Sequence, residues 1–357
     1  MIMIGQKKQS EDAGVSFSPS VSDRTAVASV RIEWHGEWSA AVSDAFAAMP
    51  YDHLMDPMLV RRLWENGLGR DRQKIAVVRA LDGRPVGVVP LRKRGKMSWQ
   101  LLTQYVMPYA RFFVLPEYTD AALQVLGREI DCDNVSFTRT PVNTRMLRPE
   151  ESWVVALAPT YAELMQRTKY ARKDRQCRQR SAHLTVLEDR YDDLPEALEH
   201  WQAKWREEGS HATATRKDDL LLSFRILAEQ GRLKTFSLHD GDKFAAMEMN
   251  MIGPATMYAM TAIMRDEYRP ASAGNRLTLA AMEWGCAHGM AEYDMLWSSG
   301  HYKKRWAEPL TRSYRLIRRP LGSEALGCAV EEIKNFVWTL RHKTSATPEL
   351  TLSKHDH

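Results

Sequence analysis

The sequence predicts an α/β protein built from two similar halves, each a β-sheet flanked by helices. A strand, an Asp-Gly turn and a second strand occur in that order around Asp82-Gly83 and again around Asp240-Gly241, about 160 positions apart. Helical stretches precede the hairpin both times, so we interpret the chain as a structural duplication. Two unrelated α/β domains are the alternative interpretation.

Size and composition limit the classes of function. The chain has 357 residues, 44% of them apolar, which allows a large core and is typical of about two domains. A net charge of +5 fits anionic small ligands, an acidic carrier protein or a membrane surface, and is too weak to predict nucleic-acid binding. The four cysteines are scattered, so we expect neither a disulfide framework nor a zinc site, but a reducing cytoplasm. No window approaches the ~20 apolar residues of a membrane span, so we expect a soluble cytoplasmic protein, at most peripheral to the inner membrane.

The first half is expected at residues 26–151, after a polar, Ser-rich arm at residues 1–25. Apolar runs bounded by turn residues predict its strands, and Asp-Gly supplies the positive φ angles of the hairpin turn. The expected elements are a strand at 27–34, helices at 39–49 and 57–67, strands at 75–80, 86–92, 99–105 and 110–115, a helix at 120–129 and a strand at 134–138.

The second half is expected at residues 152–320, followed by a C-terminal helix and polar tail at 321–357. The same order of elements recurs in it. We expect a strand at 153–157, helices at 161–180, 194–207 and 218–229, the second hairpin, a third strand from 256, a helix that ends near 289, and strands at 293–297 and 311–317; a last helix is expected at 324–340.

The helix that opens the second half is strongly basic. Seven cations fall within fourteen residues, and Lys169, Arg172, Arg175 and Arg178 recur every three residues, which would place them along one helical face. Such a patch suits the phosphates of a nucleotide-like cofactor, an acidic carrier protein or anionic lipid headgroups. A solvated helix face explains it equally well.

The second hairpin combines methionines with a carboxylate. Period-two alternation sends Met247, Met249 and Met251 to one face of the strand, and Glu248 and Asn250 to the other. The methionines are interpreted as ordinary core, or as the wall of a slot for a linear acyl chain. If Glu248 is buried, desolvation raises its pKa and makes it a candidate general base, whereas an edge strand would leave it at the surface.

The segment Arg265–Arg276 leads from the third strand into a helix. Pro270 prevents an early helix start, Ser272 or Asn275 can cap the helix, and Gly274 lets backbone N–H groups approach an oxyanion. Arg269 and Arg276 add positive charge. The segment lacks Gly-x-Gly-x-x-Gly and a Walker lysine, so as a generic phosphate motif it is weak.

Four features together resemble the BioF-like or CelD-like acetyltransferase family of the GNAT superfamily, which is related to the FemAB peptidyltransferases. The resemblance covers roughly residues 30–318. Its features are the strand from Gly83 to Leu91 ending in Pro-Leu, the Arg-rich helix Lys169–Arg180, the helix, strand and glycine turn of Leu220–Ala246, and the run of Asp294, Gly300, Tyr302, Lys303 and Trp306, which is the most specific.

The resemblance implies a tandem GNAT-like (acyl-CoA N-acyltransferase) fold with two mixed sheets flanked by helices, and a donor site in the second half. The donor's pyrophosphate or phosphopantetheine would lie at Ala271–Asn275. Relatives often have Ser-Pro-Gly there, whereas this chain has Ala-Ser-Ala-Gly, so the resemblance implies a thioester donor, either acyl-CoA or acyl carrier protein, and no metal.

The implied reaction is transfer of an acetyl or long-chain acyl group to an amine of a sugar, an amino acid or a lipid, including a sphingoid base, as in polysaccharide or lipid biosynthesis. The candidate bases are Glu248, Asp294 and His301, Tyr302 is the candidate acid to the thiolate, and Lys303 is a carbonyl or phosphate contact. Arg172, Arg175, Arg269, Ser272, Gly274, Asn275 and Arg276 are the candidate donor-binding residues.

Two other functions fit the same sequence. One is a FemX-like transferase that uses aminoacyl-tRNA, against which the mild net charge and the lack of a long coiled-coil insertion argue. The other is a non-catalytic module that only binds an acyl group or saccharide.

Overall fold

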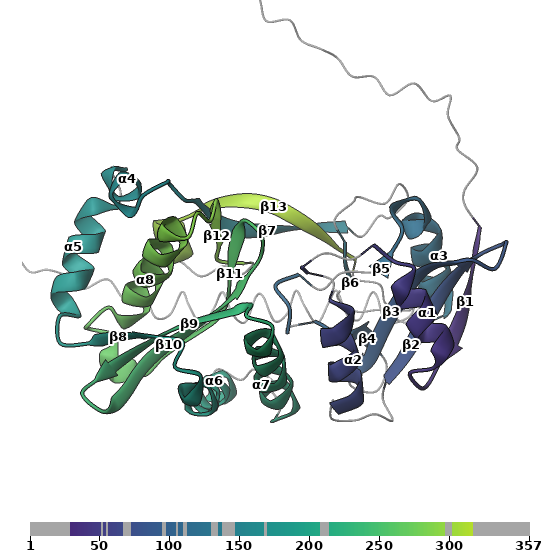
Figure 1. Cartoon of the computed structure of the whole chain (residues 1–357), viewed down its shortest axis with the longest axis horizontal. Helices are drawn as coiled ribbons and strands as arrows, with labels where there is room; N and C mark the ends of the chain where they lie inside the picture. The colour runs from purple at the N-terminus through teal and green to yellow at the C-terminus, as the bar shows by residue number, and fades with distance from the viewer. Residues whose placement is uncertain are drawn as a thin grey trace, which may run out of the picture.

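The chain forms two β-sheets flanked by helices, which confirms the predicted fold class (Figure 1). The computed structural model describes residues 29–50, 53–54, 56–66, 73–94, 98–104, 106–109, 113–129, 135–137, 147–167, 170–207, 214–296 and 302–316. The expected arm at 1–25 and the expected C-terminal helix and tail at 321–357 lie outside these residues.

The first half has a sheet with helices on both faces. Its elements are β1 (Val30–His35), α1 (Ala40–Ala47), α2 (Pro57–Asn66), β2 (Gln73–Ala80), β3 (Pro85–Arg94), β4 (Ser98–Leu101), β5 (Phe113–Val114) and α3 (Thr119–Glu129). The sheet order is β1-β2-β3-β4, with β5 paired to β3, and each of these pairings is antiparallel. Successive residues of β2 alternate between two cores: Ile75 and Val77 pack with α1 and α2, and Ala76 and Val78 pack with α3.

The larger sheet belongs mostly to the second half. Its order is β6-β13-β7-β12-β11-β10-β9-β8, and it is mixed because β11 and β12 are parallel while the other described pairings are antiparallel. The elements are β6 (Val135–Phe137), β7 (Leu147–Ala156), α4 (Tyr161–Gln166), α5 (Ala171–Arg180), β8 (Thr185–Glu188), α6 (Leu194–Glu207), α7 (Ala214–Glu229), β9 (Leu233–Asp240), β10 (Lys243–Ile252), β11 (Thr256–Met264), α8 (Ala273–Ala287), β12 (Glu292–Asp294) and β13 (Glu308–Leu316).

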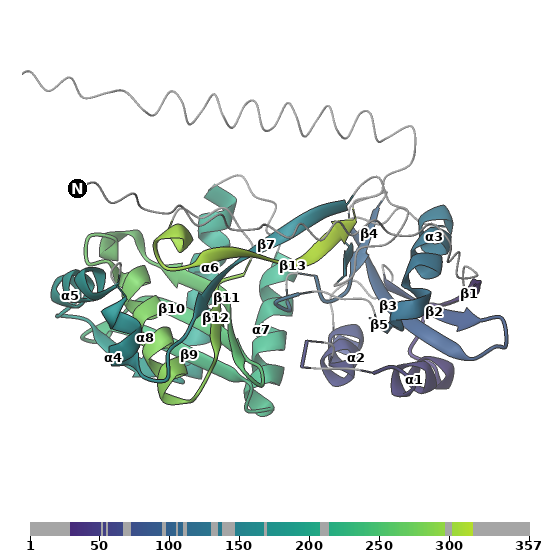
Figure 2. The same cartoon turned by 90° about the horizontal axis from the view of Figure 1, so that it is seen from above.

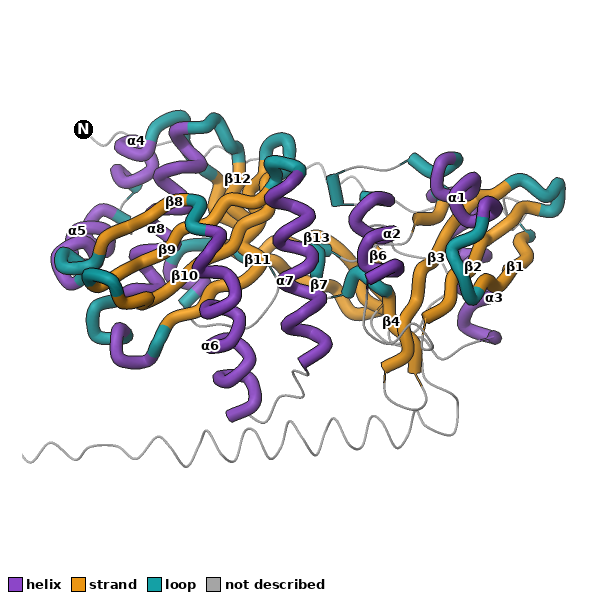
Figure 3. The backbone as a smooth tube through the Cα atoms, turned by 60° about the horizontal axis from the view of Figure 1, so that its bottom comes forward, coloured by secondary structure: helices purple, strands orange, loops and turns teal. Residues whose placement is uncertain are grey.

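The two faces of the larger sheet are covered by different helices (Figure 3). Side chains of α6 and α7 pack on one face, and side chains of α4, α5 and α8 pack on the other. Because β10 exposes alternate residues to these two layers, the whole strand from Phe244 to Met251 is buried.

The order of elements repeats, as the duplication predicts. A strand, two helices and three further strands form β1-α1-α2-β2-β3-β4 and again β8-α6-α7-β9-β10-β11. In both series the four strands pair antiparallel in chain order. Both Asp-Gly turns close hairpins, and their glycines have the positive φ that the turn requires, +85° at Gly83 and +60° at Gly241.

The expectation of one helix from Tyr161 to Arg180 is wrong, because the segment breaks into α4 and α5. The Thr160 side chain caps α4, and the chain becomes extended at Arg167, whose guanidinium donates to Ala156 O. Tyr170 then turns its ring into the core, and its hydroxyl donates to Trp306 O. These tertiary contacts override the helical propensity of the segment. Lys169 lies outside the described residues.

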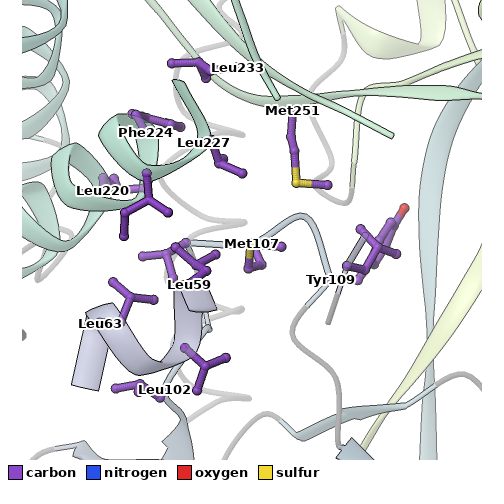
Figure 4. Packing of buried hydrophobic residues seen from close by; sticks show 14 of the residues in the cluster. Leu59, Leu63, Leu102, Met107, Tyr109, Leu220, Phe224, Leu227, Leu233 and Met251 are labelled. Carbon is purple, nitrogen blue, oxygen red and sulfur yellow. The ribbon is translucent and has the colours of Figure 1, made fainter. Parts of the chain in front are cut away.

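The two halves share one hydrophobic core. Leu59 and Leu63 of α2 face Leu220, Phe224 and Leu227 of α7, with Met107, Tyr109 and Met251 beside them (Figure 4). Ion pairs Arg92–Asp219, Arg62–Glu229 and Arg232–Asp56 also join the halves.

Two strands of the larger sheet extend toward the first half. β7 and β13 run side by side from the second half toward the first (Figures 1 and 2). The strand β6, from within residues 26–151, pairs with the far end of β13.

Candidate active site

The parallel strands β11 and β12 separate soon after they meet. They pair at three positions, the last of which is Tyr258 with Asp294. β12 ends there, whereas β11 continues to Met264 and leads to the start of α8. In α/β sheets, ligands bind outside the carboxyl ends of strands where neighbouring chains diverge. We therefore place the candidate site at this divergence.

The register of β10 and β11 is irregular close to the same point. Met249 lies opposite Thr261, and Asn250 lies opposite Ala259, so β11 has one extra residue, Met260. A bulge of this kind bends the strand and re-aims its side chains, and bulges are common beside active sites.

The two candidate carboxylates lie on opposite faces of the sheet. Glu248 shares its face with Tyr293, under α8. Asp294 follows Tyr293 in β12, so it points to the other face, where Tyr258 and the three methionines of β10 pack against the first half. The two carboxylates therefore cannot act together on the same proton.

Glu248 is a buried carboxyl group, only 2% exposed. The hydroxyl of Tyr293 donates a hydrogen bond of 2.6 Å to its Oε1. Burial raises the pKa of Glu248 to about 7, and hydrogen bonds from Tyr293 and Asn250 and the charge of Lys303 offset part of that increase. A carboxyl group with this pKa is suited to accept a proton near neutral pH.

Asp294 has a donor on each carboxylate oxygen. Leu296 N donates to Oδ1 at 2.8 Å, and the Tyr109 hydroxyl donates to Oδ2 at 2.7 Å. Tyr109 in turn contacts the hydroxyl of Ser152 on β7. The turn that Asp294 opens holds Leu296 at φ +58°, a conformation that is unfavourable for a residue with a branched side chain. Asp294 therefore stabilises this turn through the hydrogen bonds that its two oxygens accept.

Lys303 binds the backbone carbonyls of the same turn. Its ammonium donates to Met295 O and to Leu296 O, and the residue is buried. Burial lowers the pKa of Lys303 to about 8, and the negative charges of Asp294 and Glu248 oppose this decrease. Lys303 is therefore within electrostatic reach of carboxylates on both faces of the sheet.

Tyr302 and Trp306 flank Lys303 differently. Tyr302 is 44% exposed, yet desolvation of its hydroxyl and the charge of Glu248 raise its pKa to about 12. Trp306 is buried, and its indole N–H donates to Asn275 Oδ1 at 3.2 Å. The segment after β12 is thereby fixed to the start of α8. Gly300 and His301 lie outside the described residues.

The N-terminus of α8 carries no side-chain cap from Ser272. This residue occupies the cap position with φ +59°, and its hydroxyl makes no capping hydrogen bond. The Asn275 amide oxygen is bonded to Trp306 instead, so the expectation that Ser272 or Asn275 caps the helix is wrong. The first N–H groups of a helix without a side-chain cap, with the positive end of its dipole, are suited to bind an anion.

Arg276, which is partly buried, adds a positive charge one turn into α8. Its Nη1 is buried and has no hydrogen-bond partner among the described residues. Burial lowers the pKa of Arg276, and the charge of Arg178 lowers it further. A buried guanidinium N–H without a partner is costly, and an anionic ligand would satisfy it.

The remaining predicted donor-binding arginines lie elsewhere. α5 packs against α8 through Cys177, whose thiol contacts Ser272 O, and through Arg178, which pairs with Glu283. Arg172 and Arg175 are on the exposed side of α5. Arg269 is exposed and pairs with Asp266 at 2.7 Å. The Arg269 carbonyl accepts from Ser272 N at the cap position, but no side-chain hydrogen bond or ion pair among the described residues links the guanidinium of Arg172, Arg175 or Arg269 to the start of α8.

Tyr293, Tyr109 and Ser152 also contact the candidate carboxylates or their neighbours, and none of them is among the site residues expected from the sequence. Alternation within β12 was the available signal for Tyr293, since it separates Tyr293 from Asp294 by face. Tyr109 and Ser152 meet Asp294 from distant parts of the chain, and no local pattern signals that contact.

Among the described residues, no group of three His, Cys, Asp or Glu side chains is placed to hold a metal ion, and no helix is long and apolar enough to cross a membrane.

Known proteins are similar to this chain in one matched domain, and several solved structures align with most of its length. Residues 165–304 match the family model described as "Acetyltransferase (GNAT) domain". No curated protein sequence matches the chain. Similar solved structures include FemX (13% identity, 80% of this chain and 97% of that chain, TM-score 0.46). A protein of unknown function from Bacteroides thetaiotaomicron VPI-5482 is similar too (12% identity, 81% and 100%, TM-score 0.49). A third is a tandem GNAT protein from the clavulanic acid biosynthesis pathway (11% identity, 80% and 97%, TM-score 0.44). The matched range contains all the candidate site residues named from the sequence, and over residues 165–304 the chain is similar to a GNAT acetyltransferase domain.

Proposed function

We propose that this protein is an N-acyltransferase that moves an acyl group from an acyl-CoA thioester to an amine. The observation that carries the proposal is the buried Glu248, with a pKa of about 7, inside an acyltransferase domain and on the α8 face of the diverging strands. An acceptor amine is protonated at neutral pH and must lose a proton before it attacks a carbonyl carbon. Glu248 has the pKa that such a base needs.

The donor's phosphates bind at the start of α8 in this proposal. Two features of that helix support it: the first turn has no side-chain cap from Ser272, and Arg276 holds a buried N–H without a partner among the described residues. Gly274 lies in this first turn and lets an anion approach the backbone closely. The exposed Arg172 and Arg175 are assigned to a wider contact surface, where an acidic carrier protein could present an alternative thioester.

The reaction then balances as follows. Glu248 accepts a proton from the ammonium, the amine forms a C–N bond to the thioester carbonyl, and the C–S bond breaks. The products are an amide and a thiol, so the departing thiolate must gain a proton. A thiol has a pKa near 8.5, which matches the pKa of about 8 at Lys303 far better than that of about 12 at Tyr302. We therefore assign this proton to the Lys303 ammonium rather than to Tyr302. The attacking nitrogen loses its second proton as the amide forms, and the neutral Lys303 amine takes it up, so that the net proton released by the reaction stays on Glu248.

Asp294 is assigned a positioning role. Its two oxygens already accept hydrogen bonds that fix the turn at Leu296. Glu248 is therefore the base that we favour among the three candidates.

The acceptor is proposed as an amine of a sugar, an amino acid or a lipid, in line with the resemblance to BioF-like and CelD-like acetyltransferases. The methionines of β10 indicate which length of acyl group fits. Met247, Met249 and Met251 are fully buried among core side chains of both halves, which favours the core interpretation and a short acyl group.

The test is a transfer assay with the purified chain. Acetyl-CoA, a long-chain acyl-CoA and an acylated carrier protein are each combined with glucosamine, amino acids and a sphingoid base. Thiol release and the mass of the amide product are measured. We expect amide formation with at least one pair, and at least 100-fold slower formation by Glu248→Gln.

Two results would contradict the proposal. Donor binding without thiol release across the panel would indicate a binding module. Transfer that occurs only from an aminoacyl-tRNA donor would indicate the FemX-like alternative. A Glu283→Gln variant, which changes an exposed carboxylate on α8, serves as the matched control.

A further inference from the structure

The first half reaches the candidate site through two side chains. Tyr109 donates to Asp294, and its ring packs edge-on against the ring of Tyr258, with centroids 6.1 Å apart. His53 stacks on Tyr258 from another side, and its Nε2 lies 2.9 Å from the Tyr258 hydroxyl. Tyr258 and Asp294 are the last paired residues before β11 and β12 separate. Side chains of the first half therefore contact both strands at the point where they separate.

A continuous series of contacts runs from Tyr109 to Lys303. The Tyr109 hydroxyl holds one oxygen of Asp294, whose other oxygen accepts from Leu296 N. The carbonyls of Met295 and Leu296 accept from the Lys303 ammonium. β7 stabilises the same turn, because Met295 N donates to Trp153 O at 2.8 Å, and the preceding residue, Ser152, contacts the Tyr109 hydroxyl.

We propose that Tyr109 is a positioning residue for the acyl-transfer reaction, so that the first half completes the active site of the second. This inference rests on the proposed function. The hydroxyl of Tyr109 fixes Asp294, Asp294 fixes the left-handed turn at Leu296, and the turn fixes Lys303, which protonates the leaving group. Without the hydroxyl, Asp294 loses a donor and a turn that includes an unfavourable backbone conformation is held less firmly.

The hydroxyl and the ring of Tyr109 have separate jobs. The ring is part of the core shared by the two halves, and Tyr109→Phe keeps that packing. The hydroxyl contacts Ser152 of β7 and Asp294 at the turn. The proposed donor-phosphate site at Arg276 belongs to α8 and is not part of this series. Loss of the hydroxyl should therefore impair the chemical step without weakening donor binding.

The test is steady-state kinetics of the full chain with acyl-CoA and amine. We expect Tyr109→Phe to lower kcat by about 10- to 100-fold, because small misplacements of catalytic groups have effects of this size, while KM for acyl-CoA stays within about twofold. Ser152→Ala, which removes the second contact of the same hydroxyl, should lower kcat to a smaller extent. Tyr118→Phe is the matched control, since its hydroxyl bonds Arg84 within the first half, and it should leave both constants unchanged.

The outcomes separate the two proposals. A Tyr109→Phe protein with the kcat of the wild type overturns the positioning role and leaves the proposed function standing. Equal losses of kcat and of donor affinity, with a lower Tm, also overturn it, because they indicate a general structural role. A wild-type protein that transfers no acyl group to any amine overturns the proposed function itself, and the positioning role with it.

Discussion

The hydroxyl of Tyr293 donates a hydrogen bond of 2.6 Å to Oε1 of Glu248, and both side chains are buried between the sheet and α8. Burial disfavours the ionised carboxylate, whereas the hydrogen bond favours it. The balance leaves the pKa of Glu248 at about 7 and raises that of Tyr293 well above its usual value. Tyr293 thus stays a hydrogen-bond donor while Glu248 gains and loses a proton near neutral pH.

Removing the carboxylate should abolish most of the activity. Glu248→Gln keeps the size of the side chain but cannot accept a proton, so kcat should fall by about 10²- to 10⁴-fold. Asp294→Asn should fall less, because Asp294 holds a turn in our assignment. The measurement is amide formation at pH 8 for both variants. Full activity in both would remove both carboxylates as candidates for the base.

Tyr293→Phe should shift the pH profile. The Tyr293 hydrogen bond lowers the pKa of Glu248, so its loss should raise that pKa above about 7. Since the base must be ionised, the rising limb of kcat/KM against pH should move to higher pH. The profile is measured from pH 5 to 9 beside the wild type. A limb that moves to lower pH, or does not move, would contradict Glu248 as the titrating group.

The raised pKa of Glu248 should also make stability depend on pH. The folded protein binds this proton more tightly than the unfolded chain, in which the pKa of Glu248 is 4.5. The resulting stabilisation is complete below pH 4.5 and is lost as pH rises through about 7. Glu248→Gln lacks this dependence, so its Tm relative to wild type should rise between pH 5 and pH 8. Groups beyond the reach of the Glu248 charge titrate alike in both proteins, so a Tm difference that stays constant between pH 5 and pH 7 would contradict the burial of an ionisable Glu248.

Gly274→Ala should separate stability from donor binding. A Cβ at Gly274 would meet no atom nearer than Met264 Sδ at 3.9 Å, so the fold should tolerate it. Alanine in a helix is favoured over glycine by up to about 1 kcal/mol, and Tm should stay equal or rise. The added methyl group stands at the first turn of α8, so KM for acyl-CoA should increase. An unchanged KM would indicate that the donor's phosphates bind elsewhere.

Leu59→Ala should destabilise both halves together. Leu59 is fully buried in the core that the halves share, and such a truncation costs about 2–5 kcal/mol. Leu81→Ala is the matched control, because Leu81 is 78% exposed and its loss should change stability by less than about 0.5 kcal/mol. Chemical denaturation should give one transition at a lower midpoint for Leu59→Ala. Two separate transitions in the wild type would show that the halves unfold independently.

Local patterns predicted much of the fold. The Asp-Gly pairs marked both hairpins, because a tight turn needs residues with positive φ, and both turns are present at Gly83 and Gly241. Alternation in β10 put the methionines and Glu248 on opposite faces, as the two cores confirm. The break between α4 and α5 was missed, because it depends on Tyr170 docking against Trp306 rather than on any helix breaker.

The candidate site was predicted only in part, because its geometry also depends on tertiary contacts that local patterns do not show. Residues close in sequence could be grouped, so the Asp294, Tyr302 and Lys303 run and the segment into α8 were recognised. The positions of the cations around the site could not be predicted. Arg172 and Arg175 are exposed, whereas Arg276 has a buried N–H without a partner among the described residues. A helical spacing tells which residues share a face, and only packing decides which face meets the neighbouring helix.

The sequence by itself determined the duplicated α/β order, the hairpins and the separation of Glu248 from the methionines by face of β10, because turn chemistry and alternation act over a few residues. The burial of Glu248 depends on the helices that cover that face. The tertiary structure alone decided that Glu248 and Asp294 lie on opposite faces, and that Tyr109 of the first half meets Asp294 of the second. Those two residues are 185 positions apart, and the contact exists only because the shared core brings the loop after β4 to the divergence of β11 and β12.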